Sequence, residues 1–286
     1  MSFFAKRYKQ CVRTTFKSMK TWMWLLGIFV GGIMLYDFFP RRLRLTRFVM
    51  GAAVGALLML LYLLVASFIA ARKDIKLYET LDKFGFSMEY LRAYEQYRII
   101  GKPFRLQYAA EYAEIFLNIG QPQDALNYLN AIAIPPNAPV NELVGFFYVY
   151  VAAALKTNNV PLAEEIWRRY EGTLMQAKSS PYYHAISVMT ILPLIYIDCC
   201  AGRVQRAYEQ TVAFMNSKDY QNCLLPTIDI DIVYLYELVA LGRLNEAAAL
   251  QNALAVKLQN YEPQFAALKG KIIADFNKAS RGELPL

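Results

Sequence analysis

The chain has 286 residues, 56% of them hydrophobic, and a formal charge of +8 at neutral pH. That length fits one large or two modest domains. Residues 1–76 hold thirteen Lys or Arg against two Asp, which leaves 18 of the 31 basic and 21 of the 23 acidic residues for the remainder. Binding along a phosphate backbone needs a basic face, so this mildly acidic remainder excludes a nucleic-acid partner for the body of the chain.

Two apolar runs lie near the N-terminal end. Residues 22–39 carry one charge, Asp37, and as a helix would cover about 27 Å of a hydrocarbon core of roughly 30 Å. Residues 48–71 carry none, which is typical of a transmembrane helix. No small-residue cleavage site follows the first run, so we expect an uncleaved segment. The sequence predicts a transmembrane helical hairpin over 22–71, preceded by a basic cytoplasmic tail, 1–21.

Four arginines lie in the predicted loop of this hairpin, where they could meet anionic headgroups at the membrane surface. Basic residues in the tail and in 72–83 outnumber them ten to four, which favours both termini in the cytoplasm of a cell-membrane protein. A partly inserted hairpin that stays wholly inside and the inverted topology are the alternatives. The loop arginines are Arg41, Arg42, Arg44 and Arg47.

Small residues recur four apart in both runs, as Gly27 and Gly31 in the first and Gly51 and Gly55 in the second. This spacing lets helices approach closely in lipid. We expect the two helices to pack on each other through these glycines. Homo-oligomerisation through Gly51 and Gly55 is the alternative.

The rest of the chain repeats one pattern, a long apolar-rich helix followed by a turn and an alanine-bearing second helix. Gly or Asn ends the first helix because these residues accept the left-handed conformation, and an Ala five residues later lets the two helices approach. The four turns with their alanines are Gly120 with Ala125, Asn158 with Ala163, Gly202 with Ala207, and Gly242 with Ala247; the predicted first helices are 106–119, 141–156, 184–200 and 228–241.

One of these helices carries a conflicting signal. Residues 227–236, TIDIDIVYLY, alternate with a period of two, as a strand does. Pro226 just before the segment and two acidic residues, Asp229 and Asp231, at its start suit the N-terminal end of a helix. We therefore predict a helix here.

Residues 110–137, AEYAEIFLNIGQPQDALNYLNAIAIPPN, resemble a tetratricopeptide repeat in the positions of Gly120, Ala125 and Pro136. The resemblance implies an all-α fold, an α-α hairpin solenoid of about four repeats over 74–280. The apolar-periodic stretch 263–277 would be a capping helix, and 281–286 a tail.

Members of this family bind peptides or helices on a concave face built by the first helix of each repeat. The resemblance therefore implies a partner-binding groove, aromatic and slightly acidic, without the Lys/Asn set that holds a terminal carboxylate in some members. Its residues would be Gln107, Glu114, Tyr148, Leu192, Tyr196, Asp229 and Tyr236.

Signs of catalysis are absent from the sequence. The only histidine is His184, the four cysteines show no metal-binding spacing, and no nucleotide-binding, hydrolase or metalloprotease motif occurs. We expect no enzyme activity, no catalytic residue, no cofactor and no metal site.

The expected function is that of a membrane-anchored adaptor or scaffold, with its groove in the cytoplasm and a protein or peptide partner that is itself membrane-associated. Two alternatives stay open. The chain could be a non-catalytic subunit of a larger membrane complex that uses the hairpin as its main interface, or a peptide-responsive membrane receptor.

Overall fold

A computed structural model describes the backbone of Val12 and of residues 45–101, 104–177, 183–221, 227–261 and 266–286. The chain divides into two units, Met1–Glu79 and Thr80–Leu286. Every described element is helical and no strand occurs in these ranges, so the expected all-α class is confirmed for them.

The first described helix, α2, runs over Leu45–Phe84. It contains the whole second apolar run and continues through the charged residues that follow. The first run, with Gly27 and Gly31, lies outside the described residues, as do Arg41, Arg42 and Arg44. Arg47, Gly51 and Gly55 lie on the backbone of α2, in a part whose side-chain surroundings are not described.

Among the described residues, no helix is both long enough and apolar enough to cross a membrane.

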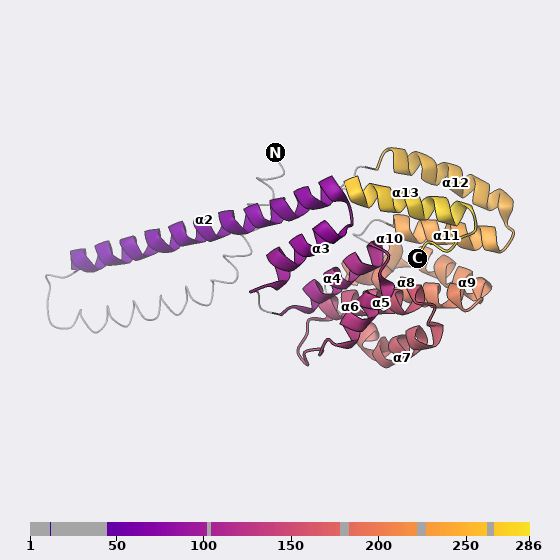
Figure 1. Ribbon diagram of the computed structural model, residues 1–286, viewed down its shortest axis with the longest axis horizontal. Coiled ribbons are helices and arrows are strands. Elements are labelled where there is room, and N and C mark those ends of the chain that lie inside the picture. Colours follow the sequence, from indigo (N-terminus) through magenta and orange to yellow (C-terminus); the bar gives the residue numbers. More distant parts are fainter. Residues whose placement is uncertain (1–11, 13–44, 102–103, 178–182, 222–226, 262–265) are drawn as a thin grey trace. The chain divides into compact units, whose positions relative to one another are not determined.

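Helices α3 to α13 form the second unit in chain order (Figure 1). The predicted helices are confirmed to within a few residues, including α11 in the segment with strand-like alternation. In chain order they are α3 Met88–Tyr94, a π-helical turn Glu95–Ile99, α4 Leu106–Asn118, α5 Pro122–Asn130, α6 Val140–Lys156, α7 Val160–Ala177, α8 Tyr183–Cys200, α9 Val204–Met215, α10 Lys218–Gln221, α11 Ile228–Ala240, α12 Leu244–Gln259 and α13 Ala266–Ser280.

The turns after α4, α6, α8 and α11 share one hydrogen-bond pattern. After α4, the Gln121 N–H donates to Phe116 O at 2.9 Å and the Gly120 N–H to Leu117 O at 3.4 Å, with Gly120 at φ 79°. This pairing satisfies the last carbonyls of a helix through one left-handed residue. Asn158, Gly202 and Gly242 repeat it at φ 56°, 75° and 73°, as predicted.

Each turn returns the chain as a second helix packed on the first, in the pairs α4–α5, α6–α7, α8–α9 and α11–α12. The four alanines five residues after the turns are buried, since a methyl group leaves room for the partner helix. Ala125, Ala163 and Ala207 have no exposed surface, and Ala247 is 4% exposed.

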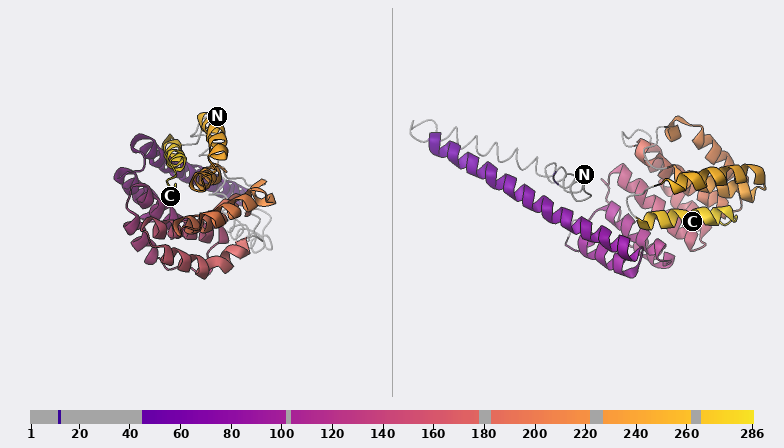
Figure 2. Two further views of the ribbon diagram at one scale, coloured as in Figure 1. Left: turned by 90° about the vertical axis from the view of Figure 1, so that its right-hand side faces the viewer. Right: turned by 90° about the horizontal axis from the view of Figure 1, so that it is seen from above.

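First helices also contact one another, α4 with α6, α6 with α8 and α8 with α11. One apolar cluster joins α4 to α9 and the start of α11, and a second joins α11, α12 and α13. Helix α13 packs along α11 and contacts α12. The first helices and α13 thus form an inner layer, with α5, α7, α9 and α12 outside it (Figures 1 and 2).

A carboxylate in the first helix of one hairpin binds the N-terminal end of the first helix of the preceding hairpin. Glu142 in the first turn of α6 accepts the Gln107 N–H of α4 at 3.3 Å and pairs with Arg105 Nη2 at 2.8 Å. No side chain caps α4 at Arg105 itself, so Glu142 supplies an acceptor to an N–H group that the helix leaves free. This contact ties the N-terminal end of α4 to that of α6.

Candidate functional site

The second unit contains a large cavity of about 1210 Å³, bounded by the inner layer. This volume exceeds the 300–1,000 Å³ usual for a small-molecule pocket. Five carboxylates and three lysines line it, together with Tyr148, Tyr196, Tyr261 and Phe86. The lining is therefore slightly acidic and partly aromatic.

Six of the seven predicted groove residues lie together on this cavity. Gln107 and Glu114 come from α4, Tyr148 from α6, Leu192 and Tyr196 from α8, and Asp229 from α11. Each stands 13, 10 or 6 residues before the turn of its own hairpin, and these three spacings fall on one face of a helix. Their role in binding a partner stays a prediction.

Tyr236 is the exception and does not line the cavity. It packs against both apolar clusters, and burial raises the pKa of its hydroxyl. Tyr236 thus lies in the packing between the two clusters, on a helix that α13 also packs along. Only Ile228 and Asp229 of α11 reach the cavity.

Two of the three cavity lysines lie beside carboxylates. Lys271 Nζ of α13 lies 3.7 Å from Glu114 Oε1 of α4, and Lys278 Nζ lies 3.9 Å from Asp275 Oδ1. Burial raises the pKa of Asp275, although Lys271, Lys278 and Lys156 oppose the rise. Burial also lowers the pKa of Lys156, helped by Lys271 and Lys278.

Asp229 faces the cavity and keeps exposed surface there, yet protein surrounds it on most sides. Burial is the main cause that raises its pKa, and Lys271 opposes it. Burial is the largest cause of the raised pKa of Tyr148, and the negative charges of Asp229, Glu114 and Asp275 raise it further. The cavity therefore disfavours further uncompensated charge.

The last residues of the chain enter this cavity. Pro285 is buried and Leu286 lines the wall. The Tyr196 hydroxyl donates to Pro285 O at 3.0 Å in a buried hydrogen bond. Leu284 and Leu286 pack against the first apolar cluster. In the left view of Figure 2 the C-terminal end accordingly lies among the helices.

Two parts of the site are absent from the sequence prediction. Helix α13 was expected as a cap, but its residues 267–278 supply a wall of the cavity, and 281–286 was expected only as a tail. A signal existed in Gly282, which has φ 72° and makes the same pair of hydrogen bonds as the four earlier turns. Its spacing of 40 residues from Gly242 could have marked α13 as a further first helix.

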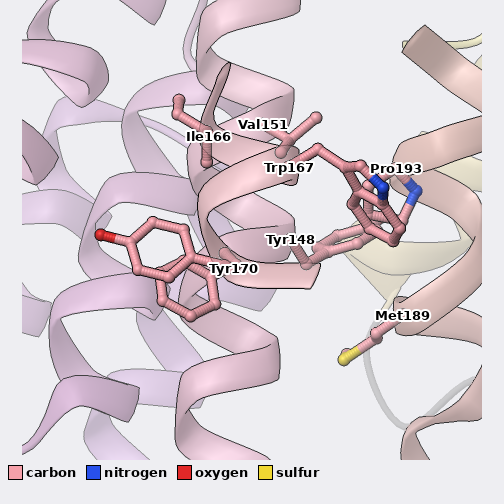
Figure 3. A pocket seen from close by; sticks show the side chains of 8 residues that line it. Tyr148, Val151, Ile166, Trp167, Tyr170, Met189 and Pro193 are labelled. Atoms are coloured by element: carbon pink, nitrogen blue, oxygen red, sulfur yellow. The ribbon is translucent and has the colours of Figure 1, made fainter. Parts of the chain in front are cut away.

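A smaller apolar hollow lies between α6, α7 and α8 (Figure 3). Tyr170 stacks on Phe147 with ring centroids 3.5 Å apart, and Trp167 lies beside Tyr148 and Pro193. The side chains fill this hollow and leave no volume for a ligand. It belongs to the packing that holds Tyr148 at the cavity wall.

No group of three or more His, Cys, Asp or Glu side chains in the described part of the chain could hold a metal ion. Cys199 is a buried free thiol whose pKa is raised by burial, so it is a poor nucleophile. The backbone of His184 lies in the first turn of α8.

Comparison of this chain with known protein families, curated protein sequences and solved structures finds no match.

Proposed function

We propose that this protein is a membrane-anchored adaptor whose body, a helical solenoid similar to tetratricopeptide arrays, offers its cavity to a protein or peptide partner. The observation that carries the proposal is the cavity of about 1210 Å³ on the inner layer. Repeated helices place side chains from α4, α6, α8 and α11 along one continuous wall, which is how an extended ligand is bound. Tyrosines on such a wall add contact area at low entropic cost.

Helix α2 supports the anchor. Leu60, Leu61 and Tyr62 are consecutive and all exposed, so they point in three directions about 100° apart rather than along one stripe. Soluble proteins rarely expose so continuous an apolar patch, whereas lipid tails solvate it at no cost. The other exposed large apolar side chains in this stretch are Leu57, Leu64, Val65, Phe68 and Ile69.

The length of α2 fits an anchor with an extension. Its 40 residues span about 60 Å, twice a hydrocarbon core of roughly 30 Å. The uncharged part ends before Arg72, and Arg72–Phe84 then continue the helix for about 20 Å. In this arrangement the charged end of α2 leaves the bilayer, with its basic residues at a cytoplasmic surface.

The test is photo-crosslinking in living cells with the full chain. A photoreactive amino acid replaces Gln107, which lines the cavity and is exposed, or Glu171, which is exposed on the outer helix α7 as the matched control. We expect one membrane-fraction protein to crosslink from position 107 and not from 171. Equal adducts from both positions, or none, would refute the adaptor.

The same experiment separates the alternatives. A third probe at Val65 of α2 reports on the apolar stretch. Adducts from position 65 alone would indicate a subunit held in a larger complex by its membrane segment. A peptide-sized adduct at position 107 would indicate a peptide-responsive receptor.

A further inference from the structure

The cavity already holds a segment of its own chain. Helix α13 ends at the Gly282 turn, where the Glu283 N–H donates to Lys278 O at 2.9 Å and the Gly282 N–H to Ala279 O at 3.0 Å. After the other four turns of this type a second helix begins within two residues. After Gly282 no second helix follows; Pro285 and Leu286 instead line the cavity, and Leu284 and Leu286 pack on its apolar floor.

Apolar packing and one hydrogen bond hold this segment in the cavity, and a second hydrogen bond within the segment sets its bend. Leu284 and Leu286 pack on the apolar cluster that includes Leu192. Tyr196, 9% exposed, donates its hydroxyl to Pro285 O at 3.0 Å. The Leu286 N–H donates to Leu284 O at 2.9 Å, a tight bend around Pro285 that lets both leucines face the floor.

The charges of the cavity do not explain this contact. Lys271 and Lys278 face Glu114 and Asp275, and burial lowers the pKa of the third cavity lysine, Lys156, which disfavours its charged form. Burying another charge beside them would cost free energy without a free partner. Recognition at this end of the cavity therefore rests on apolar surface and on one hydroxyl that donates to a backbone carbonyl.

We propose that this end of the cavity is a subsite for a peptide segment with the pattern apolar–Pro–apolar, and that Leu284–Leu286 occupies it in cis. The proposal rests on the proposed function and names the partner chemistry for the same site. A partner segment of this kind replaces Leu284–Leu286 on Leu192 and Tyr196. The rest of the cavity remains open beside the segment, because the volume of about 1210 Å³ is measured with it in place.

The tethered segment Leu284–Leu286 competes with a free peptide for the subsite and so weakens binding of that peptide. A tethered segment has an effective concentration of order 1 mM, so a peptide that binds the empty subsite with a Kd of about 0.1 mM is weakened about tenfold. Removing the tethered segment should therefore raise peptide affinity, and removing the Tyr196 hydroxyl should lower it severalfold.

The experiment uses the full chain in detergent micelles and a fluorescent, amidated peptide RGELPL, read by anisotropy. The double variant Leu284→Ser/Leu286→Ser empties the subsite. Its matched control, Arg281→Ser/Glu283→Ser, breaks an exposed ion pair in the same segment and leaves the anchors in place. We expect the first variant to bind the peptide at least tenfold more tightly than wild type, and the control to bind like wild type.

Two further comparisons sharpen the result. Tyr196→Phe, added to the emptied variant, should weaken peptide binding three- to tenfold, and the peptide RGESPS should not bind. Equal affinity of wild type and the emptied variant would overturn the proposal, as would equal binding of both peptides or no binding below 1 mM. In each of these cases the crosslink from position 107 could persist, so the adaptor function would still stand.

A measurement on wild type guards against a variant that does not fold. Millimolar RGELPL should displace the segment and raise deuterium uptake across residues 283–286, whereas RGESPS should not. Unchanged uptake with a saturating peptide would overturn the proposal without recourse to any substitution.

Discussion

A buried carboxyl group makes the stability of the helical body depend on pH. Glu237 in α11 has no exposed surface, accepts a hydrogen bond from Thr211 Oγ1 at 2.8 Å, and leaves its Oε2 buried without a partner among the described residues. Burial raises its pKa from 4.5 to about 8, and the Thr211 hydrogen bond only partly opposes this rise. Cys199 lies nearby and its pKa is raised as well.

The direction of the pH dependence of the free energy of unfolding follows from proton binding to Glu237. The folded state keeps the Glu237 proton up to about pH 8, while the unfolded chain releases it near pH 4.5, so folding binds a proton between these values. The free energy of unfolding then falls as pH rises across that window. The whole shift corresponds to about 5 kcal/mol, of which about 3 to 4 kcal/mol lies between pH 5 and pH 8.

Glu237→Gln removes this proton and keeps an acceptor for Thr211. Urea unfolding of the full chain in detergent, monitored by far-ultraviolet circular dichroism, measures the free energy of unfolding of variant and wild type. We expect the value for the Gln variant, relative to wild type, to rise by about 3 kcal/mol from pH 5 to pH 8. Other titrating groups, such as Asp229 and Asp275, cancel in the difference.

The matched control is Glu171→Gln on the exposed surface of α7, for which the difference should not change with pH. If the difference in free energy of unfolding between Glu237→Gln and wild type stays constant within about 1 kcal/mol from pH 5 to pH 8, the buried Glu237 is ionised throughout this range. The reasoning from its burial would then be wrong.

Three further predictions concern packing and the anchor. Gly202→Ala should lower the free energy of unfolding by about 1 kcal/mol because Gly202 has φ 75°, whereas Gly172→Ala within α7 should raise it by up to about 1 kcal/mol; urea unfolding measures both. Asp198→Ala, which removes a 1% exposed carboxylate paired with two arginines, should cost about 2 to 3 kcal/mol in the same assay. Leu61→Glu should release a larger fraction of the protein from membranes in carbonate extraction, since a charge in lipid costs about 3 kcal/mol, and Leu244→Glu on α12 should not.

The helical hairpins follow from local features of the sequence. Gly120, Gly202 and Gly242 end their helices with positive φ, and Ala125 and Ala207 are fully buried at the helix crossings. These are local effects, because a left-handed residue and a methyl group act within one hairpin whatever surrounds it. Local spacing also placed most of the predicted groove residues on one wall, since inner-face positions recur with each first helix.

Tertiary structure alone decided which surface of α11 stays open and what fills the cavity. Tyr236 has the spacing of a groove residue, but it packs against both apolar clusters, and α13, 30 to 44 residues further along the chain, packs along its helix. The hydrogen bond between Tyr196 and Pro285 joins residues 89 positions apart. Hydrophobic periodicity shows which face of a helix is buried, but not which other element packs on that face. Contacts between residues so far apart in the chain therefore leave no local pattern in the sequence.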